Sequence, residues 1–259
     1  MKLLDLTFPT AAENLACDEA LLDRCDERGE ETLRFWESPV PFVVVGYGNR
    51  IASEVNGEEC QRRAIPILRR CSGGGTVVQG PGCLNYNLTL RIDQDGPLTT
   101  VTGTNEFVME RNRAALEQLL GLNVAVKGHT DLAFQEVESG AATPPFNSQP
   151  TTLKFPWLKF SGNAQRRRRH ALVFHGTILH GFDLSLIDAL LRFPSAQPDY
   201  RASRGHTQFV RNVRASPPRL RAALTSAWDA REELSDVPRA RLAELCRDQY
   251  ENETWNHRR

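Results

Sequence analysis

Apolar and small residues recur every three or four positions between residues 11 and 28, with acidic side chains between them. This period predicts an amphipathic helix that packs one face on the rest of the protein. The same reasoning predicts a long helix at residues 104–120 and a helix at residues 53–63, with Ser53 as its N-cap. Three further helices are expected in the last third of the chain, at residues 183–191, 217–231 and 238–250.

Short runs of β-branched and aromatic residues predict the strands. Residues 84–92 alternate leucine or tyrosine with polar side chains, so we expect one buried and one wetter face. Residues 32–37 and 42–47 surround a Ser-Pro-Val-Pro segment and are expected to be two strands joined by a turn. The remaining strands are expected at residues 65–70, 76–78 and 171–180.

The order of these elements, with strands and helices interspersed, predicts an α+β fold in which helices flank a mixed, largely antiparallel sheet. The stretch at residues 136–156 is dense in Gly, Pro, Ser and Thr and is expected to be a surface loop. A chain of 259 residues is long enough to bury one large core, so we expect residues 1–259 to form a single domain.

Composition and charge limit the partners and the location. Lysine plus arginine and aspartate plus glutamate both number 32, so no net charge favours nucleic acid or a membrane surface. The first residues lack the apolar core of a signal peptide and no apolar run is long enough to span a bilayer, so we expect a cytoplasmic protein. The six cysteines form no CxxC pair and have no histidine at zinc-ligand spacing, which indicates reduced thiols and no metal site.

Three segments place polar or charged residues beside small ones, an arrangement suited to binding a phosphate-containing ligand. The first is RRCSGGGTVV at residues 69–78, in which three glycines permit positive φ and a close approach of backbone N–H groups. Arg70 and Ser72 supply hydrogen-bond donors for a carboxylate or a phosphate. Taken alone, the glycine run fits a tight hairpin turn equally well.

The other two segments contain a lysine and a histidine. Lys159 begins KFSGNAQR and, as a flexible point charge, can follow a carboxylate as it becomes an anhydride and then an oxyanion. His175 lies in the apolar segment FHGTIL at residues 174–179. By residue type alone, Lys159 fits a solvated surface position and His175 a hydrogen-bonded core position, so neither identifies a site by itself.

In this order and spacing, the three segments resemble the catalytic domain of the biotin/lipoate protein ligase superfamily, and specifically its lipoate–protein ligase A branch. The resemblance extends over nearly the whole chain, from Glu13-Asn14 to Trp255-Asn256. It implies the fold of that catalytic domain and a two-step reaction. Lipoate or octanoate would react with ATP and Mg²⁺ to give an acyl-adenylate, and the acyl group would then pass to a lysine of an acceptor protein.

The resemblance also assigns roles by position. Lys159 would contact the acyl carbonyl and the phosphate during catalysis. The residues implied at the nucleotide are Arg70, Gly75, Thr76, Val77 and Val78. Those implied to line the pocket are Ser72, Gly73, Gly74, Asn85, Asp131, Ser161, Gly162, Ala164, Arg166 and His175. The sequence departs from the family pattern just after the glycines, at residues 76–80, and at Cys83.

A second enzymatic interpretation stays open. The few residues behind Trp255 do not match the small accessory domain of full-length ligases, and some relatives without that domain are octanoyl or lipoyl transferases with an acyl-cysteine intermediate. Their cysteine lies between the Asp131-like position and the lysine, or shortly after the histidine strand. This chain has no cysteine in residues 131–159 and has Ser195 at the second place. We therefore prefer the ligase, with a transferase that uses an acyl-carrier or acyl-protein donor as the alternative.

The implied acceptor is a lipoyl domain or the H-like protein of the glycine-cleavage system, with a separate small accessory subunit as a further partner. Because such acceptors are typically acidic, the run Arg166–Arg169 is either a docking patch or a solvated edge. The GRGRxGR-like loop and the Lys-Trp-Pro-Asn segment of biotin ligases are both missing. A non-catalytic relative that only binds lipoyl groups would have no need of Arg70 and Lys159, which are retained.

Overall fold

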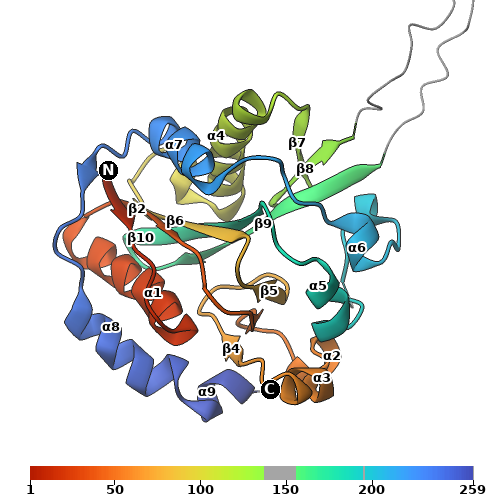
Figure 1. The fold of residues 1–259 in the computed structure, drawn as a ribbon. Coiled ribbons are helices and arrows are strands. Elements are labelled where there is room, and N and C mark those ends of the chain that lie inside the picture. The colour runs from red at the N-terminus through yellow and green to blue at the C-terminus, as the bar shows by residue number, and fades with distance from the viewer. Residues whose placement is uncertain (137–155, 195, 259) are drawn as a thin grey trace, which may run out of the picture.

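The computed structural model describes residues 1–136, 156–194 and 196–258, whose strands form a large and a small sheet (Figure 1). In the described residues β1 pairs in parallel with both of its neighbours, and the other pairings of the large sheet are antiparallel. The expected α+β class with a mixed, largely antiparallel sheet is confirmed. The spatial order is β11 (Glu232–Glu233), β1 (Lys2–Asp5), β2 (Thr32–Trp36), β6 (Cys83–Arg91), β10 (Ala171–Leu179), β9 (Trp157–Arg167), β8 (Asp131–Gln135) and β7 (Val124–Lys127).

The small sheet has β3 (Phe42–Val45) at its centre. β4 (Ile67–Arg69) is parallel to it and β5 (Val77–Gln79) is antiparallel. The two strands expected at residues 32–37 and 42–47 are present as β2 and β3, and they belong to different sheets, β2 to the large one and β3 to the small one. The segment between them carries the chain from one sheet to the other, and the rings of Trp36 and Phe42 stack with centres 6.5 Å apart.

Helices lie on both sides of the large sheet (Figure 1). α1 (Ala11–Arg28) begins at a capping box formed by Thr10 and Glu13 and ends where Gly29 takes the left-handed conformation, with φ 71°. The other described helices are α2 (Ile51–Glu54), α3 (Gly57–Arg62), α4 (Val101–Leu120), α5 (Ser185–Leu190), α6 (His206–Phe209), α7 (Pro217–Ala227), α8 (Arg239–Leu245) and α9 (Glu253–His257). Two 3₁₀ turns, η1 (Pro97–Thr99) and η2 (Asp199–Arg201), and a π-helical turn, η3 (Cys246–Tyr250), complete the described elements.

The single helix expected at residues 53–63 is wrong, since the structure has two short helices there. Ser53 lies inside α2, and the chain becomes extended at Val55. Asn56 then caps α3, with its side-chain oxygen 3.4 Å from the backbone nitrogen of Glu59. Val55 is 1% exposed and forms an isolated β-bridge with Leu191, so tertiary packing decides where the helix breaks.

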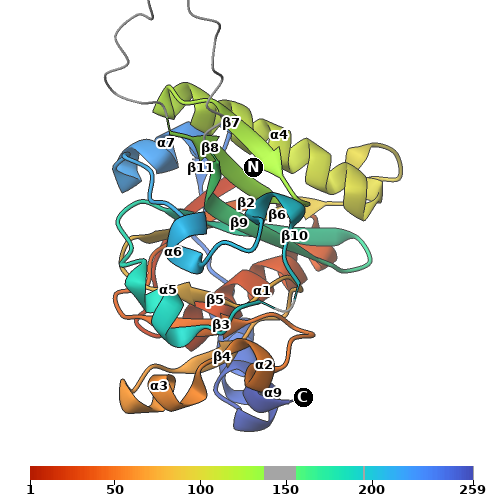
Figure 2. The ribbon, with the colours of Figure 1, turned by 90° about the vertical axis from the view of Figure 1, so that its right-hand side faces the viewer.

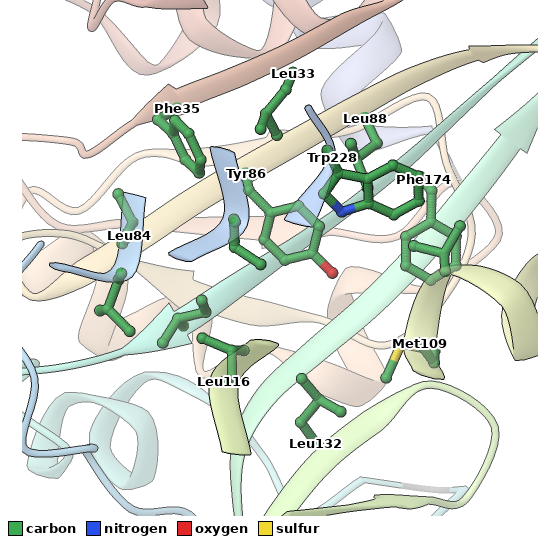
Figure 3. Packing of buried hydrophobic residues seen from close by; sticks show 14 of the residues in the cluster. Leu33, Phe35, Leu84, Tyr86, Leu88, Met109, Leu116, Leu132, Phe174 and Trp228 are labelled. Carbon is green, nitrogen blue, oxygen red and sulfur yellow. The ribbon is translucent and has the colours of Figure 1, made fainter. Parts of the chain in front are cut away.

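One face of the large sheet carries the main apolar core (Figure 3). Leu84, Tyr86 and Leu88 of β6 belong to it, together with buried residues of α4 and α7. A polar chain crosses this core: the Trp228 ring nitrogen donates to Asn112 at 2.7 Å, and the Asn112 amide donates to the Tyr86 hydroxyl at 2.9 Å. The alternation in residues 84–92 thus predicts this buried face correctly.

The second face of the large sheet is polar, yet it is covered as well. Asn85, Asn87 and Thr89 of β6 are at most 5% exposed, because α1 packs across β6 and β10. The expected wetter face of residues 84–92 is therefore wrong, since its polar side chains are buried. Buried polar groups are costly unless they find polar partners, so this face is the natural place for a polar ligand site.

The stretch expected to be a surface loop, residues 136–156, lies almost wholly outside the described residues. Within the part that the structure describes, no helix is both long enough and apolar enough to cross a membrane.

Candidate active site

Neighbouring strands bring the expected site residues to the polar face of the large sheet. His175 of β10 pairs with Ala164 of β9, and Thr177 of β10 pairs with Gly162 of β9. Asp131 of β8 pairs in turn with Gly162. Paired residues of adjacent strands share a face, and positions two apart along a strand do so too. These five residues therefore lie on one side of the sheet.

A β-bulge in β9 places Lys159 on the same side. Asp131 pairs with Gly162 and Ala133 with Lys159, so β9 uses one residue more than β8 over this stretch. The extra residue, Phe160, is fully buried in the apolar core. In a regular strand Lys159 and Gly162 would lie on opposite faces, and the lysine would point into that core.

Asp131 holds the Lys159 ammonium group. Lys159 Nζ lies 2.7 Å from Asp131 Oδ1, and the lysine covers Gly162, where a Cβ atom would come within 2.8 Å of Nζ. The Tyr200 hydroxyl donates to the other oxygen of Asp131 at 2.8 Å. Burial, together with the Asp131 charge, raises the pKa of Tyr200, so its hydroxyl stays protonated. Tyr200 belongs to none of the sequence motifs, and only the fold brings it to the site.

The glycine turn, residues 72–75, packs between β9 and the turn that follows β3. Gly74 has φ 85°, a conformation that favours glycine. A Cβ atom at Gly74 would lie 3.4 Å from the Cβ of Ala164, and one at Gly46 would lie 2.1 Å from the Gly74 carbonyl oxygen. Since Ala164 is two residues from the glycine that Lys159 covers, the turn and the lysine are neighbours on one face.

Arg70 is buried and holds the carbonyl groups of the glycine turn. Its Nη2 donates to the carbonyl oxygens of Gly73 at 2.6 Å and Gly75 at 2.8 Å, and its Nε donates to Ser72 Oγ at 3.0 Å. Burial lowers the pKa of Arg70 to about 10, which leaves it charged at neutral pH. Arg70 therefore shapes the turn from inside, and its contact with a nucleotide stays a prediction.

Ser72 is hydrogen-bonded to His175, with Oγ and Nε2 2.5 Å apart. Burial, together with the nearby charge of Arg70, lowers the pKa of His175 to about 3, so the ring is neutral at neutral pH. Ser72 Oγ already accepts a hydrogen bond from Arg70. Its own proton is therefore assigned to His175 Nε2, which places the ring proton on Nδ1. The pair fixes the Ser72 hydroxyl without adding charge to the site.

Glu54 positions the residues that follow the glycine turn. Its carboxylate accepts hydrogen bonds from the Thr76 backbone nitrogen at 3.2 Å, from the Thr76 hydroxyl and from Asn49 Nδ2, the last at 2.7 Å. Val77 and Val78 continue as β5 and pack into the apolar clusters on either side of the small sheet. Glu54 thus fixes the start of β5, although no sequence motif contains it.

Asn85 lies on β6 and Arg166 on β9, the two strands that flank β10 in the large sheet. The Asn85 side-chain oxygen accepts from the Thr177 hydroxyl at 2.7 Å, and that hydroxyl accepts from the Gln79 amide at 2.6 Å. The Arg166 guanidinium carbon lies 5.4 Å from the centre of the Tyr47 ring.

Ser161 is turned away from the other expected site residues. It pairs with Ile178 of β10 and Leu132 of β8, both of which belong to the apolar core. Its side chain is 1% exposed and lies 3.5 Å from the side-chain oxygen of Asn163. The structure therefore separates Ser161 from Lys159 and Gly162, its neighbours in the motif.

The run Arg166–Arg169 is not a uniform patch. Arg167 donates to the Leu98 carbonyl at 2.6 Å, and Arg168 pairs with Asp23 at 2.9 Å, so both are tied to neighbouring elements. Arg169 is exposed, whereas Arg166 points to the site.

A small cavity of about 20 Å³ lies between α1, the segment before the glycine turn and the polar face of the sheet. Such a volume holds about one water molecule. The residues that line it are Leu15, Asp18, Arg70, Cys71, Asn87, Val173, His175 and Tyr250.

All six cysteines lie in the described residues, and none of them has an activated thiol. Five are buried and Cys71 is half-buried. Burial raises the pKa of Cys17 to about 11 and that of Cys25 to about 12, and it raises the pKa of Cys71 as well. A protonated thiol is a poor nucleophile. Among the described residues, no group of three or more His, Cys, Asp or Glu side chains could hold a metal ion.

Known proteins of similar sequence are lipoate ligases and octanoyltransferases. The model of the lipoyl protein ligase A/B catalytic domain family matches residues 10–222. A putative lipoate-protein ligase A of Aeropyrum pernix is 28% identical over 233 residues, which cover 89% of this chain and 75% of that protein. The octanoyltransferase LipM of Brevibacillus brevis is 27% identical over 267 residues, which cover 96% of this chain and 95% of that protein.

Solved structures of ligases have the same fold. The bi-partite lipoate protein ligase of Thermoplasma acidophilum aligns with a TM-score of 0.79 at 24% identity, over 99% of this chain and 95% of that one. A lipoate-protein ligase A bound with ATP gives a TM-score of 0.75 at 24% identity, over 99% and 98% of the two chains. Both confirm the expected catalytic-domain fold. Because the family model spans most of the sequence, the chain belongs to the lipoyl protein ligase A/B catalytic domain family.

Proposed function

We propose that the protein is an ATP-dependent lipoate–protein ligase, which converts lipoate or octanoate and MgATP to an acyl-adenylate and passes the acyl group to a lysine of an acceptor protein. The observation that supports this most strongly is the Lys159 ammonium, held by Asp131 at 2.7 Å beside the glycine turn. A fixed cation next to a glycine turn suits a reaction in which charge develops on a phosphate and on an acyl oxygen.

In the first step, a carboxylate oxygen of the acid attacks the α-phosphorus of ATP, and pyrophosphate leaves. Lys159 offsets the negative charge that the two substrates bring together. The ion pair with Asp131 restricts the lysine to one position, so the ammonium is placed before the substrates arrive. The metal would enter with the nucleotide as MgATP.

In the second step, the amine of the acceptor lysine attacks the acyl carbon, and AMP leaves. The acyl-adenylate is already activated, so this step needs positioning and stabilisation of the oxyanion rather than a nucleophile from the enzyme. Thiols whose pKa is raised by burial fit this route, because none of them is ionised at neutral pH.

We place the acyl chain in the cavity beside His175. Leu15 and Val173 supply apolar walls, and the His175 ring, which is neutral at neutral pH, loses less hydration beside an apolar chain than a charged ring would. Asp18 and Arg70 line the same cavity, so only part of its wall is apolar. The cavity of about 20 Å³ is too small for an eight-carbon chain, since it holds about one water molecule. Substrate entry therefore requires α1 and the segment before the glycine turn to move apart.

The proposed acceptor is a lipoyl domain or an H-like protein of the glycine-cleavage system. The similar T. acidophilum ligase is described as bi-partite and is named with its E2 lipoyl domain as parts of one lipoylation system. We therefore also propose that a separate small protein takes part in the reaction of this chain.

The extensive match to the octanoyltransferase LipM supports a second candidate, an octanoyl or lipoyl transfer from an acyl-carrier or acyl-protein donor without ATP. In this chain such a transfer would be direct, because no thiol is placed or ionised to form an acyl-cysteine.

The two candidates are separated by incubating the full chain with a purified lipoyl domain and following the mass of that domain. The ligase is expected to add the acyl group from free lipoate or octanoate only when MgATP is present, and to exchange labelled pyrophosphate into ATP. A transferase would add the acyl group from octanoyl acyl carrier protein without ATP. Transfer without ATP, combined with no pyrophosphate exchange, would overturn the proposed ligase.

A further inference from the structure

Two guanidinium groups meet at the ring of Tyr47. The Arg258 guanidinium carbon lies 4.0 Å from the ring centre and that of Arg166 lies 5.4 Å from it. Arg258 also lies 3.7 Å from the centre of the Trp255 ring. Both guanidinium carbons therefore lie within 5.4 Å of the same ring centre. Two positive charges gathered at one ring repel each other, and an anion bound between them would offset that repulsion.

The structure provides no such anion among the described residues. Arg166 Nε and the Nε and Nη2 atoms of Arg258 are buried without a hydrogen-bond partner there. By contrast, Arg167 donates to a backbone carbonyl and Arg168 pairs with Asp23. Buried guanidinium donors without partners are costly, so this arrangement favours binding of an external anion.

The segment that carries Arg258 is fixed to the glycine-turn region. Arg69 is fully buried and donates to the Arg258 carbonyl at 2.8 Å and to the Gly46 carbonyl at 2.9 Å. The Trp255 ring nitrogen donates to the Arg69 carbonyl at 2.9 Å. Figures 1 and 2 show α9 beside β4, in agreement with the contacts between these elements. Arg258 is therefore held near the candidate active site by buried contacts.

The Tyr47 loop is itself attached to the glycine turn. The Tyr47 backbone nitrogen donates to the Ser72 carbonyl at 2.8 Å, and Gly46 packs against Gly74. An anion between Arg166 and Arg258 would thus lie next to the turn at which the family resemblance implies the nucleotide.

We infer that Arg166, Arg258 and Tyr47 form a binding site for a pyrophosphate-type anion, which receives the two terminal phosphates of ATP and the pyrophosphate that leaves during adenylation. Arginine suits this ligand because its planar fork donates two parallel hydrogen bonds to a phosphate. The inference rests on the proposed function for the identity of the reaction, but not for the binding of the anion itself. Arg258 would accelerate adenylation and leave the transfer from acyl-adenylate to the acceptor unchanged.

The first test is calorimetric titration of the full chain with inorganic pyrophosphate, for the wild type, Arg258→Met and Arg231→Met. The Arg231 side chain is 87% exposed and pairs with Asp229, which makes it a matched control. We expect pyrophosphate binding to weaken about tenfold or more in Arg258→Met, because a charge-assisted hydrogen bond contributes at least that factor. Arg231→Met should bind as the wild type does. Equal binding by the wild type and Arg258→Met, or no binding by the wild type, overturns the site.

Inorganic phosphate, titrated in parallel, distinguishes a site for the two linked phosphates from a site for any phosphate. We expect it to bind more weakly than pyrophosphate, and equal affinity would overturn the assignment to pyrophosphate. Thermal melting in phosphate-free buffer checks the fold. Arg258→Met should melt close to the wild type, because the variant removes repulsion between two arginines and keeps the backbone carbonyl that Arg69 binds.

The second test divides the reaction. Arg258→Met should slow ATP–pyrophosphate exchange about tenfold or more and transfer lipoyl groups from supplied lipoyl-adenylate at the wild-type rate. If Arg258→Met leaves exchange intact and raises the KM for the lipoyl domain, Arg258 docks the acceptor and the inference is wrong. If the wild type binds pyrophosphate through Arg258 but exchanges none into ATP, the anion site stands and the proposed function fails.

Discussion

Asp131 and Lys159 face each other from the adjacent strands β8 and β9, with the carboxylate oxygen 2.7 Å from the ammonium nitrogen. The side chains are 14% and 26% exposed, so the pair is partly shielded from water. Electrostatic interactions are stronger in such a site than at an open surface. Asp131 therefore fixes the position of the Lys159 ammonium group. The partial burial of the pair makes the attraction between this ammonium group and an approaching anion stronger than it would be at an open surface.

Replacing Lys159 by alanine is the most direct test of this arrangement. Loss of one well-placed electrostatic contact typically slows a reaction by about 10²–10³. We expect Lys159→Ala to lose at least that factor in ATP–pyrophosphate exchange and in transfer from supplied acyl-adenylate. Lys2→Ala is the matched control, because Lys2 pairs with Glu30 at the far end of the large sheet. A folded Lys159→Ala protein with the wild-type rate would contradict the assigned role.

Tyr200 should act on the reaction through Asp131. Tyr200→Phe removes the hydroxyl that donates to Asp131 at 2.8 Å and keeps the ring that packs on Phe209, with centres 5.1 Å apart. We expect kcat to fall several-fold while KM for the acid changes little, because Lys159 stays charged but is held less firmly. Steady-state kinetics with each substrate varied in turn measures this. A Tyr200→Phe protein with the wild-type kcat, beside a Tyr200→Leu protein that loses both stability and rate, would show that the ring alone matters.

The sequence predicted the local elements better than their pairing. Residues 84–92 alternate, and the residues that form the apolar face were identified correctly, because period-two burial is a local signal. Whether the polar face of residues 84–92 is exposed or buried depends on α1, which packs on that face although it precedes β6 by many residues. The two strands in residues 32–47 were likewise predicted from a local signal, but the sequence did not indicate that they join different sheets, because each pairs with residues distant in the chain.

The candidate site likewise contains some residues that local motifs indicate and others that only the fold brings near. Arg70, Ser72, Gly74 and His175 were proposed as site residues because they lie in compact motifs, and the structure brings them into contact with one another. Tyr200, which lies in a turn distant in sequence, was missed because no motif surrounds it.

The bulge at Phe160 was missed because burial of one extra residue leaves no periodic signal. That bulge reverses the side chains that follow it in the strand, and it decides that Ser161 faces the core while Lys159 faces the site.

Gly46 allows the two turns at the site to approach each other. A Cβ atom there would lie 2.1 Å from the Gly74 carbonyl oxygen, so alanine must displace backbone and not merely a flexible side chain. We expect Gly46→Ala to raise KM for ATP about tenfold or more, because the glycine turn moves away from Lys159. Gly57→Ala is the control, since nothing lies within 4 Å of a Cβ atom at that position. Wild-type kinetics for Gly46→Ala would show that the turn tolerates displacement.

His175 should make stability depend on pH. Its pKa is lowered by burial from 6.5 to about 3, so the unfolded chain binds more protons than the folded protein between these values. Its contribution to stability is therefore fully present above pH 6.5 and is lost as the pH falls towards 3. We expect His175→Gln, which cannot titrate, to show a weaker loss of stability over this range in urea unfolding. Parallel curves for the variant and the wild type would mean that His175 is protonated without cost.

The last prediction concerns the cysteines, and it separates the ligase from a transferase that forms an acyl-cysteine. Cys71 is the half-buried thiol and lies in the wall of the cavity, so it is the best placed of the six to accept an acyl group. Burial raises its pKa, which argues against an ionised nucleophile. We expect Cys71→Ser to retain ATP-dependent transfer of lipoate at close to the wild-type rate.

A variant with all six cysteines replaced extends this test. Alanine is the better replacement at the five buried positions, because a buried serine hydroxyl without a partner is costly. Thermal melting identifies whether this variant folds, and Cys71→Ser serves alone if it does not. Intact-mass measurement of the wild type after incubation with octanoyl acyl carrier protein, or with octanoate and MgATP, should find no acyl group on the enzyme. A trapped thioester, or a folded cysteine-free protein without activity, would contradict direct attack of the acceptor lysine on an adenylate and favour the transferase.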